Sequence, residues 1–256
     1  MKYKIGRFME IYLIFIFGAI IGSFLNVCIY RLPKELSIIT PRSFCPICEK
    51  TVKWYDNIPL ISFIVLKGKC RNCSTKINWH YLIVEIMNAS IYVLLYQKFS
   101  LNLYFFIFAI ISSIFIVITF IDLFHQIIPD KCSYVLIIIG IILNVTKGKD
   151  AILDSFIGLL AGGGFLYLVA VLSRGGMGGG DIKLAGGCGA ILGLKGVAST
   201  LVTAFILGAV VGIILMLFKI KGRKDPIPFG PFIVLGAFIT IFGGNFLISH
   251  IFPFVY

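Results

Sequence analysis

Acidic side chains at the borders of long apolar runs are the residues of this 256-residue sequence that could do chemistry. A charged group at membrane depth is costly, so such residues more often serve a function than decorate a helix. Five carboxylates stand in such positions: Glu85, Asp122, Asp130, Asp154 and Asp181. Two aspartates brought close in a partly dehydrated site cannot both ionise easily, so one stays an acid while the other activates water. Such a pair can hydrolyse an amide without a metal.

The stretch RGGMGGGD, residues 174–181, distinguishes one of these acids. Five glycines precede Asp181, and they are Gly175, Gly176, Gly178, Gly179 and Gly180. Glycine destabilises helices, and irregular backbone at membrane depth is tolerated only where it is buried in protein or lines a wet cavity. Asp122 ends the third expected span and the glycine loop follows the fifth. Both spans cross the membrane in the same direction, which predicts Asp122 and Asp181 at the same membrane face.

The other three acids have simpler interpretations. Asp130 follows Pro129 and is well placed to be a helix N-cap. Asp154 is expected in the first turn of its helix, where the helix dipole favours an acid. Glu85 is predicted one turn inside its span, where it could extend to the interface or pair with a basic loop residue. Together with Lys183, it could help to bind substrate or tune the aspartate pair.

Four cysteines form two C-x-x-C pairs between the first two apolar runs: Cys45, Cys48, Cys70 and Cys73. In a cytoplasmic loop, where disulfides are reduced, this spacing favours a structural Zn²⁺ held by four thiolates. The alternatives are a redox pair or unrelated thiols. A loop of this size has little core of its own, so the metal would contribute much of its folding free energy. The remaining cysteines, predicted to be small core residues, are Cys28, Cys132 and Cys188.

The composition explains what must position these residues. The chain is 59% hydrophobic and only 13% charged, which is typical of a polytopic membrane protein. We therefore predict an all-α fold of about eight transmembrane helices with a cytoplasmic zinc-binding loop. The expected spans are residues 10–30, 81–97, 101–121, 132–146, 151–173, 182–194, 197–218 and 230–249.

The formal net charge of +12 would suggest nucleic-acid binding in a soluble protein, but here the charges lie between the spans. If the large loop is cytoplasmic, 16 of the 23 basic residues fall on that side. The positive-inside rule then places both termini outside and makes the basic surface a neighbour of membrane lipids. We therefore expect no nucleic-acid partner.

Four segments carry a family resemblance: GSFLNVCIYRLP (22–33), the cysteine loop (45–73), IDLFHQIIPD (121–130) and GGGDIKLAG (178–186). In this order and spacing, the chain resembles the type IV prepilin peptidases of the GxGD group of aspartyl proteases. The resemblance implies that Asp122 and Asp181 are the catalytic aspartates. Gly178 and Gly180 occupy the glycine positions of GxGD, and Asp130 matches the aspartate of the family's Pro-Asp pair.

The resemblance also implies a location and two reactions. A multi-pass enzyme of the bacterial cytoplasmic membrane would remove the leader of prepilins or pseudopilins at the cytoplasmic edge, then N-methylate the new N-terminus using S-adenosylmethionine. Residues 1–97, with the first two spans and the cysteine loop, would be linked to methylation, and residues 98–256 would form the peptidase core. No strand followed by GxGxG occurs, so the methyl-donor site is not assigned by motif.

Three other functions compete with this interpretation. A peptidase without methylation would use the loop only to dock its substrate. A transporter could also use intramembrane acids and glycine-broken helices, but its acids would lie near the midplane and its halves would show an inverted repeat. A purely structural membrane subunit would not need the glycine loop and the acid together.

Overall fold

The computed structural model describes the backbone of residues 2–222 and 225–251, and the side chains of residues 8–222 and 225–243. Within these ranges the chain forms helices and two isolated β-bridges but no strand, which confirms the all-α prediction. The helices are α1 (Lys2–Arg31), α2 (Ile61–Val65), α3 (His80–Phe99), α4 (Leu103–His125), α5 (Asp130–Val145), α6 (Lys149–Leu172), α7 (Gly179–Leu217) and α8 (Gly230–Ile251), with short 3₁₀ helices η1 (Leu32–Lys34) and η2 (Trp54–Asn57).

Five of the described helices are long and apolar enough to cross a membrane: α1, α3, α4, α6 and α7. They expose large apolar side chains, such as Leu160 at 69% and Tyr12 at 67%, which suits contact with lipid better than contact with water. The chain is therefore a multi-pass membrane protein. Helix α5 has 16 residues and is shorter than a full span, so the number eight stays a prediction.

Helix α7 reverses direction at Gly193, where the backbone leaves the helical region at φ 71° and ψ −174°. A methyl group added at Gly162 of α6 would lie 2.6 Å from the carbonyl oxygen of Ala185 and 2.7 Å from Cγ2 of Val197. Twelve residues of straight helix would separate those two neighbours by about 18 Å. The segments 179–192 and 194–217 are therefore two antiparallel helices, as expected for the separate spans 182–194 and 197–218.

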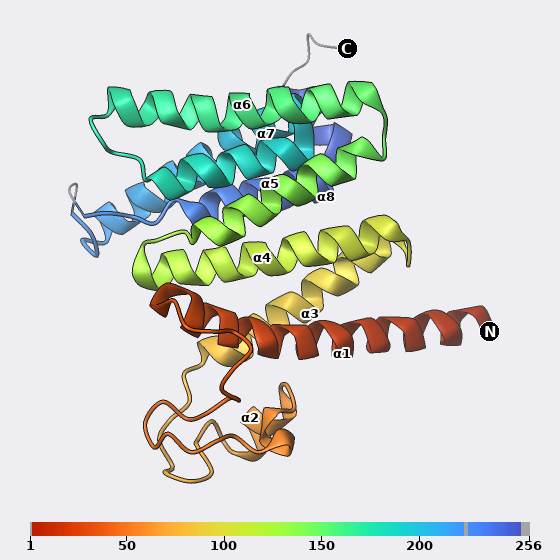
Figure 1. Ribbon diagram of the computed structural model, residues 1–256, viewed down its shortest axis with the longest axis vertical. Helices are drawn as coiled ribbons and strands as arrows, with labels where there is room; N and C mark the ends of the chain where they lie inside the picture. The colour runs from red at the N-terminus through yellow and green to blue at the C-terminus, as the bar shows by residue number, and fades with distance from the viewer. Residues whose placement is uncertain (1, 223–224, 252–256) are drawn as a thin grey trace. The chain divides into compact units, whose positions relative to one another are not determined.

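The chain divides into two compact units, residues 1–117 and 118–256. In the second unit, α5 runs parallel to the first half of α7 (Figure 1). Leu136 lies beside Gly187, and one turn further on Gly140 lies against the backbone of Ala190. The starts of α5 and α7 therefore lie at the same end of this unit.

Helix α8 packs antiparallel to the second half of α7. Near the start of α8, Phe232 lies beside Gly208, and further along, Gly236 lies against the carbonyl oxygen of Thr200. Because the second half of α7 returns toward the end where its first half began, α8 starts at that same end. Three helix N-termini thus converge where the acids were predicted.

In the first unit, α1 and α3 lie side by side (Figure 1). Gly18 and Gly22 allow this close approach, since a methyl group at either position would lie 2.7 Å from a Cα atom of α3. The Asn88 side chain donates a hydrogen bond to the carbonyl oxygen of Gly18 at 2.7 Å, which satisfies a buried amide. This pair of helices holds the two ends of the cysteine loop.

Candidate functional site

Asp122 lies in the last turn of α4 and is buried, with 5% of its surface exposed. Its Oδ2 accepts a hydrogen bond from the backbone N–H of Gly230 at 2.9 Å. Gly230 is the first residue of α8, where backbone N–H groups lack partners within the helix. The start of α8 therefore orients this carboxylate and favours its negative charge.

Asp181 lies in the first turn of α7, three residues after the N-cap Gly178. Its Oδ2 accepts the backbone N–H of Gly178 at 3.3 Å. Its Oδ1 is buried and accepts no hydrogen bond from any residue within the described ranges. Because a buried oxygen without a partner is costly, this atom has the character of a site prepared for water or a ligand.

The two carboxylates belong to one site. The charge of Asp122 acts on Asp181 through space. Ile128 links their surroundings: a methyl group at Gly180 would lie 2.8 Å from its Cβ, and one at Gly230 would lie 3.1 Å from its Cδ1. The structure thus brings together the two acids that the sequence placed on the same face.

The glycine stretch is only partly a loop. Gly179 and Gly180 already belong to the first turn of α7, while the preceding turn uses positive φ at Arg174 (51°) and Gly175 (94°). The expectation that all five glycines form irregular backbone is therefore corrected. Close approach explains the glycine at position 180, because Ile128 occupies the space that a side chain would need.

Asp130 does not cap α5. The N-cap is Pro129, and Asp130 is the first residue of the helix. Its Oδ2 forms an ion pair with the Lys183 ammonium at 2.7 Å, with 54% of the Asp130 side chain and 36% of the Lys183 side chain exposed. The Lys183 ammonium also lies 5.7 Å from the ring centre of Tyr134. These contacts tie the starts of α5 and α7 together.

Asp154 is not in the first turn of its helix, because α6 begins five residues earlier, at Lys149. Its Oδ1 accepts the backbone N–H of Leu194 at 3.1 Å, immediately after the break at Gly193. Asp154 therefore caps the second half of α7 from a neighbouring helix. The acid was visible in the sequence, but its partner 40 residues away was not.

Each C-x-x-C pair forms a turn of the same kind. In both turns, the residue after the second cysteine has a positive φ, at Glu49 (56°) and at Ser74 (58°). The four sulfur atoms lie within 4.8 Å of one another, and those of Cys45 and Cys73 are 3.8 Å apart. The cluster could therefore hold a metal ion.

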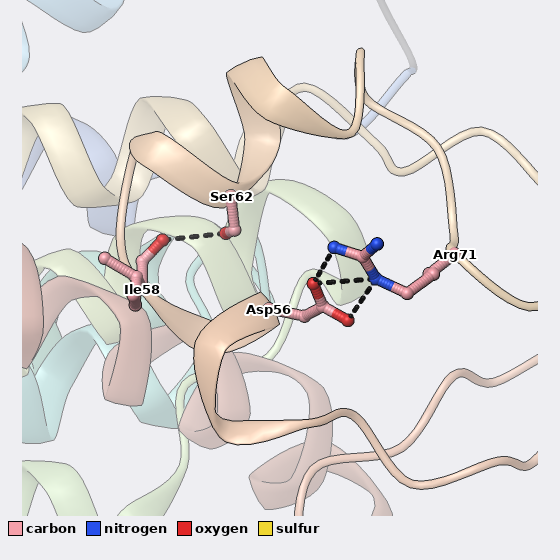
Figure 2. A network of polar contacts seen from close by, with 4 residues as sticks. All are labelled: Asp56, Ile58, Ser62 and Arg71. Carbon is pink, nitrogen blue, oxygen red and sulfur yellow. Dashed lines mark hydrogen bonds and ion pairs between the residues drawn. The ribbon is translucent and has the colours of Figure 1, made fainter.

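Two further features prepare this cluster. Hydrogen bonding with the hydroxyl and backbone of Thr75 lowers the pKa of the Cys73 thiol to about 6, which favours the thiolate that metals bind. Arg71 holds the second turn by bonding through Nε and a terminal nitrogen to both oxygens of Asp56, at 2.7–3.1 Å (Figure 2). This guanidinium keeps the pKa of Asp56 below its usual range.

Glu85 does not pair with a basic residue of the described loop. Glu85 is buried, with only 8% of its surface exposed. Its Oε2 accepts a hydrogen bond from the backbone N–H of Leu60 at 2.8 Å. It belongs to the first unit, whereas the two aspartates belong to the second. The three single cysteines are buried, as predicted, and they are Cys28, Cys132 and Cys188.

Gly230 and Ile128 are the site residues that sequence reasoning missed. Gly230 acts through its backbone N–H, which every residue except proline carries, so its type gives no signal. Ile128 is one apolar residue among many. The only available sign was a glycine at the start of the last apolar run.

Two family models match the chain. The model described as the bacterial peptidase A24 N-terminal domain matches residues 16–99, and the type IV leader peptidase family matches residues 109–213. The first match contains the cysteine cluster, and the second contains both aspartates.

Curated proteins named prepilin leader peptidase/N-methyltransferase are similar along most of their length. The protein from Bacillus subtilis is 32% identical over 93% of this chain and 96% of its own. The protein from Legionella pneumophila is 35% identical over 91% of each chain. The protein from Aeromonas salmonicida is 31% identical over 91% of this chain and 90% of its own. No solved structure matches the chain significantly.

Proposed function

Because this chain belongs to the type IV leader peptidase family, we propose that Asp122 and Asp181 are the catalytic pair with which it removes prepilin leaders. The observation that carries this proposal is the buried Oδ1 of Asp181, which has no hydrogen-bond partner among the described residues. The negative charge of Asp122 is close enough to interact with this carboxyl group. A proton on this oxygen would let Asp181 serve as the acid of the pair while Asp122 stays ionised.

The reaction needs one acid and one base. One carboxylate takes a proton from water as the water oxygen attacks the peptide carbonyl carbon. The other, protonated, gives its proton to the amide nitrogen as the carbon–nitrogen bond breaks. We assign the base role to Asp122, whose negative charge the N–H of Gly230 stabilises, and the acid role to Asp181, whose buried Oδ1 has no partner among the described residues.

The site also has a suitable location. The last turn of α4 and the starts of α7 and α8 meet at one end of the second unit, and the sequence places the excess of basic residues on that side. We propose that this end faces the cytoplasm of a bacterium. Cleavage would then occur where the apolar helix of a prepilin or pseudopilin leaves the membrane.

Zinc suits the cysteine cluster. Four sulfurs at the usual zinc–sulfur distance of about 2.3 Å form a tetrahedron with edges of about 3.8 Å. The sulfurs of Cys45 and Cys73 are separated by 3.8 Å. We propose that Cys45, Cys48, Cys70 and Cys73 hold a structural Zn²⁺ that orders the loop.

The second reaction is N-methylation of the newly exposed N-terminus, as in the relatives' name. S-Adenosylmethionine would supply the methyl group. We propose that residues 1–97 serve this step and residues 98–256 serve cleavage, which parallels the separate family models for the two regions. The described residues contain no strand, so the strand and glycine turn of soluble methyltransferases do not hold this donor here.

The test is prepilin processing by the full-length protein purified in detergent. Intact and cleaved substrate are separated by mass, and methylation of pre-cleaved substrate is followed in parallel. Asp122→Asn and Asp181→Asn should each abolish cleavage and retain methylation. Asp154→Asn is the matched control, because an amide oxygen can still accept the N–H of Leu194.

Two outcomes would contradict parts of this proposal, and a third would show that the variants are misfolded. Cleavage by either active-site variant would remove it from the pair and make Asp130 the next candidate. Cleaved but unmethylated product at saturating methyl donor would favour a peptidase without methylation. Loss of methylation in all three variants would indicate misfolding instead of lost catalysis.

A further inference from the structure

The short helix α2, in the loop between α1 and α3, has an exposed apolar face. Ile61, Ile64 and Val65 are spaced three and four residues apart, so they share one side of the helix. Their exposed fractions are 59%, 69% and 66%. We call these three side chains the α2 apolar face.

The remaining side chains of α2 are engaged within the loop. Ser62 donates a hydrogen bond to the carbonyl oxygen of Ile58 at 2.7 Å (Figure 2). The ring of Phe63 packs against that of Trp79, with 5.2 Å between centroids, and lies close to Gly68. Helix α2 is thus fixed by its inner side, and the outward face is not needed for that packing.

A partly buried hydrogen bond ties α2 to the long helix α3. The backbone N–H of Leu60, the residue before α2, bonds to the carboxylate of Glu85. Glu85 lies five residues after the start of α3 at His80, or about 7 Å along that spanning helix at 1.5 Å per residue. Amphipathic segments at a membrane surface insert their apolar side chains to a comparable depth of about 5–10 Å. If α3 enters the membrane at its start, Leu60 holds α2 level with the membrane interface.

Positive charge adjoins this face. Lys67 and Lys69 follow α2 directly, and a β-bridge pairs Lys69 with Lys76. All three lysines are exposed and form no ion pair with any described residue. Residues 32–79 contain eight Lys and Arg but only three Asp and Glu. An exposed apolar face beside unpaired lysines is complementary to an anionic lipid surface.

We propose that α2 is a membrane-interface anchor for the cysteine loop. The α2 apolar face enters the boundary between headgroups and acyl chains, while Lys67, Lys69 and Lys76 bind anionic phospholipid headgroups. Trp79, 67% exposed at the start of α3, stands where aromatic residues border a bilayer. The Glu85 contact couples this anchor to the first two long helices.

The experiment uses the full chain reconstituted in phospholipid nanodiscs. The two tryptophans, Trp54 and Trp79, both lie in or beside this loop, and replacing them with Phe removes the intrinsic tryptophan fluorescence. Ile64→Trp then reports on the apolar face. Lys50→Trp, at an exposed charged position outside α2, is the matched reporter. Quenching by lipids brominated near the headgroup and by aqueous acrylamide is measured for each.

The proposal predicts that Ile64→Trp is quenched by the brominated lipids and is about threefold less accessible to acrylamide than Lys50→Trp. Adding phosphatidylglycerol to phosphatidylcholine discs should increase the lipid quenching. Replacing Lys67, Lys69 and Lys76 with Gln should remove that increase. Elution as a single species in detergent, as for wild type, selects the folded variants.

Equal acrylamide access for the two reporters, without quenching by brominated lipids, would overturn the proposal. If the Ile64 reporter became protected only on addition of prepilin, the face would bind protein instead of lipid. An unchanged response to phosphatidylglycerol in the lysine variant would refute the electrostatic part. All three readouts are independent of cleavage and methylation, so they stand apart from the proposed function.

Discussion

Gly230→Ala should impair catalysis by moving Asp122. A methyl group at this position would lie 2.7 Å from Oδ2, whereas an ordinary contact is at least 3.4 Å. If the carboxylate yields the difference, about 0.7 Å, the 2.9 Å hydrogen bond to the backbone N–H stretches to about 3.6 Å. Such a bond no longer orients the acid.

The size of the effect follows from this displacement. A hydrogen bond to a charged group contributes about 1.5–3 kcal/mol, and a misplacement of about 1 Å in an active site can cost about 100-fold in rate. We therefore expect kcat/KM for prepilin cleavage to fall by about 10- to 100-fold, which corresponds to about 1.4–2.7 kcal/mol. Initial rates should be measured at several substrate concentrations.

Gly164→Ala is the matched control, because a methyl group there meets no atom within 4 Å. It should cleave prepilin at nearly the wild-type rate. Both variants should melt within a few degrees of wild type. A folded Gly230→Ala protein with wild-type kcat/KM would refute the orienting role of this hydrogen bond.

Three further changes test other contacts. Gly180→Ala should reduce cleavage about tenfold or more, because its methyl would lie 2.8 Å from Cβ of Ile128. Gly179→Ala is the control, since a methyl group there meets open space and should be tolerated. Equal cleavage rates for the two variants would contradict this packing. A metal chelator should remove the proposed Zn²⁺, abolish methylation and spare cleavage. Parallel loss of both activities would contradict the proposed assignment of methylation to residues 1–97. Arg71→Gln should destabilise the loop at pH 7, and this effect should shrink as pH falls below about 4. Because Arg71 lowers the pKa of Asp56, the stability that this contact contributes is lost only as pH falls through that lowered pKa. Unfolding curves of wild type and Arg71→Gln, followed by loop fluorescence, that differed equally at neutral and strongly acidic pH would contradict the assignment.

The sequence predicted much of the fold because the apolar runs are long and their breaks are clear. Even the reversal at Gly193 was anticipated within a few residues, as the gap between the expected spans 182–194 and 197–218. Asp122 and Asp181 could be assigned to one face because alternating crossings determine where each helix ends. The cysteine cluster was predictable from spacing, and the sulfur atoms do converge.

The sequence could not predict hydrogen-bond and ion-pair partners that lie far apart in the chain and meet only in the tertiary structure. Asp154 bonds to a backbone N–H 40 residues away, and Glu85 to one 25 residues before it. Asp130 had a plausible local role as a cap, but an ion pair with Lys183 replaces it. Backbone donors such as Gly230 carry no sequence signal at all. Local rules identified the acids, and long-range packing decided what they contact.

The central claim is that Asp122 and Asp181 act as one catalytic unit. The most direct test compares kcat/KM for prepilin cleavage in wild type, Asp122→Asn, Asp181→Asn and the double variant, with methylation of pre-cleaved substrate as the folding control. Residues that act as a unit lose nearly everything when either is removed, so the double variant should be no slower than the slower single variant. Losses that multiply in the double variant, or a single variant that still cleaves well, would contradict the claim.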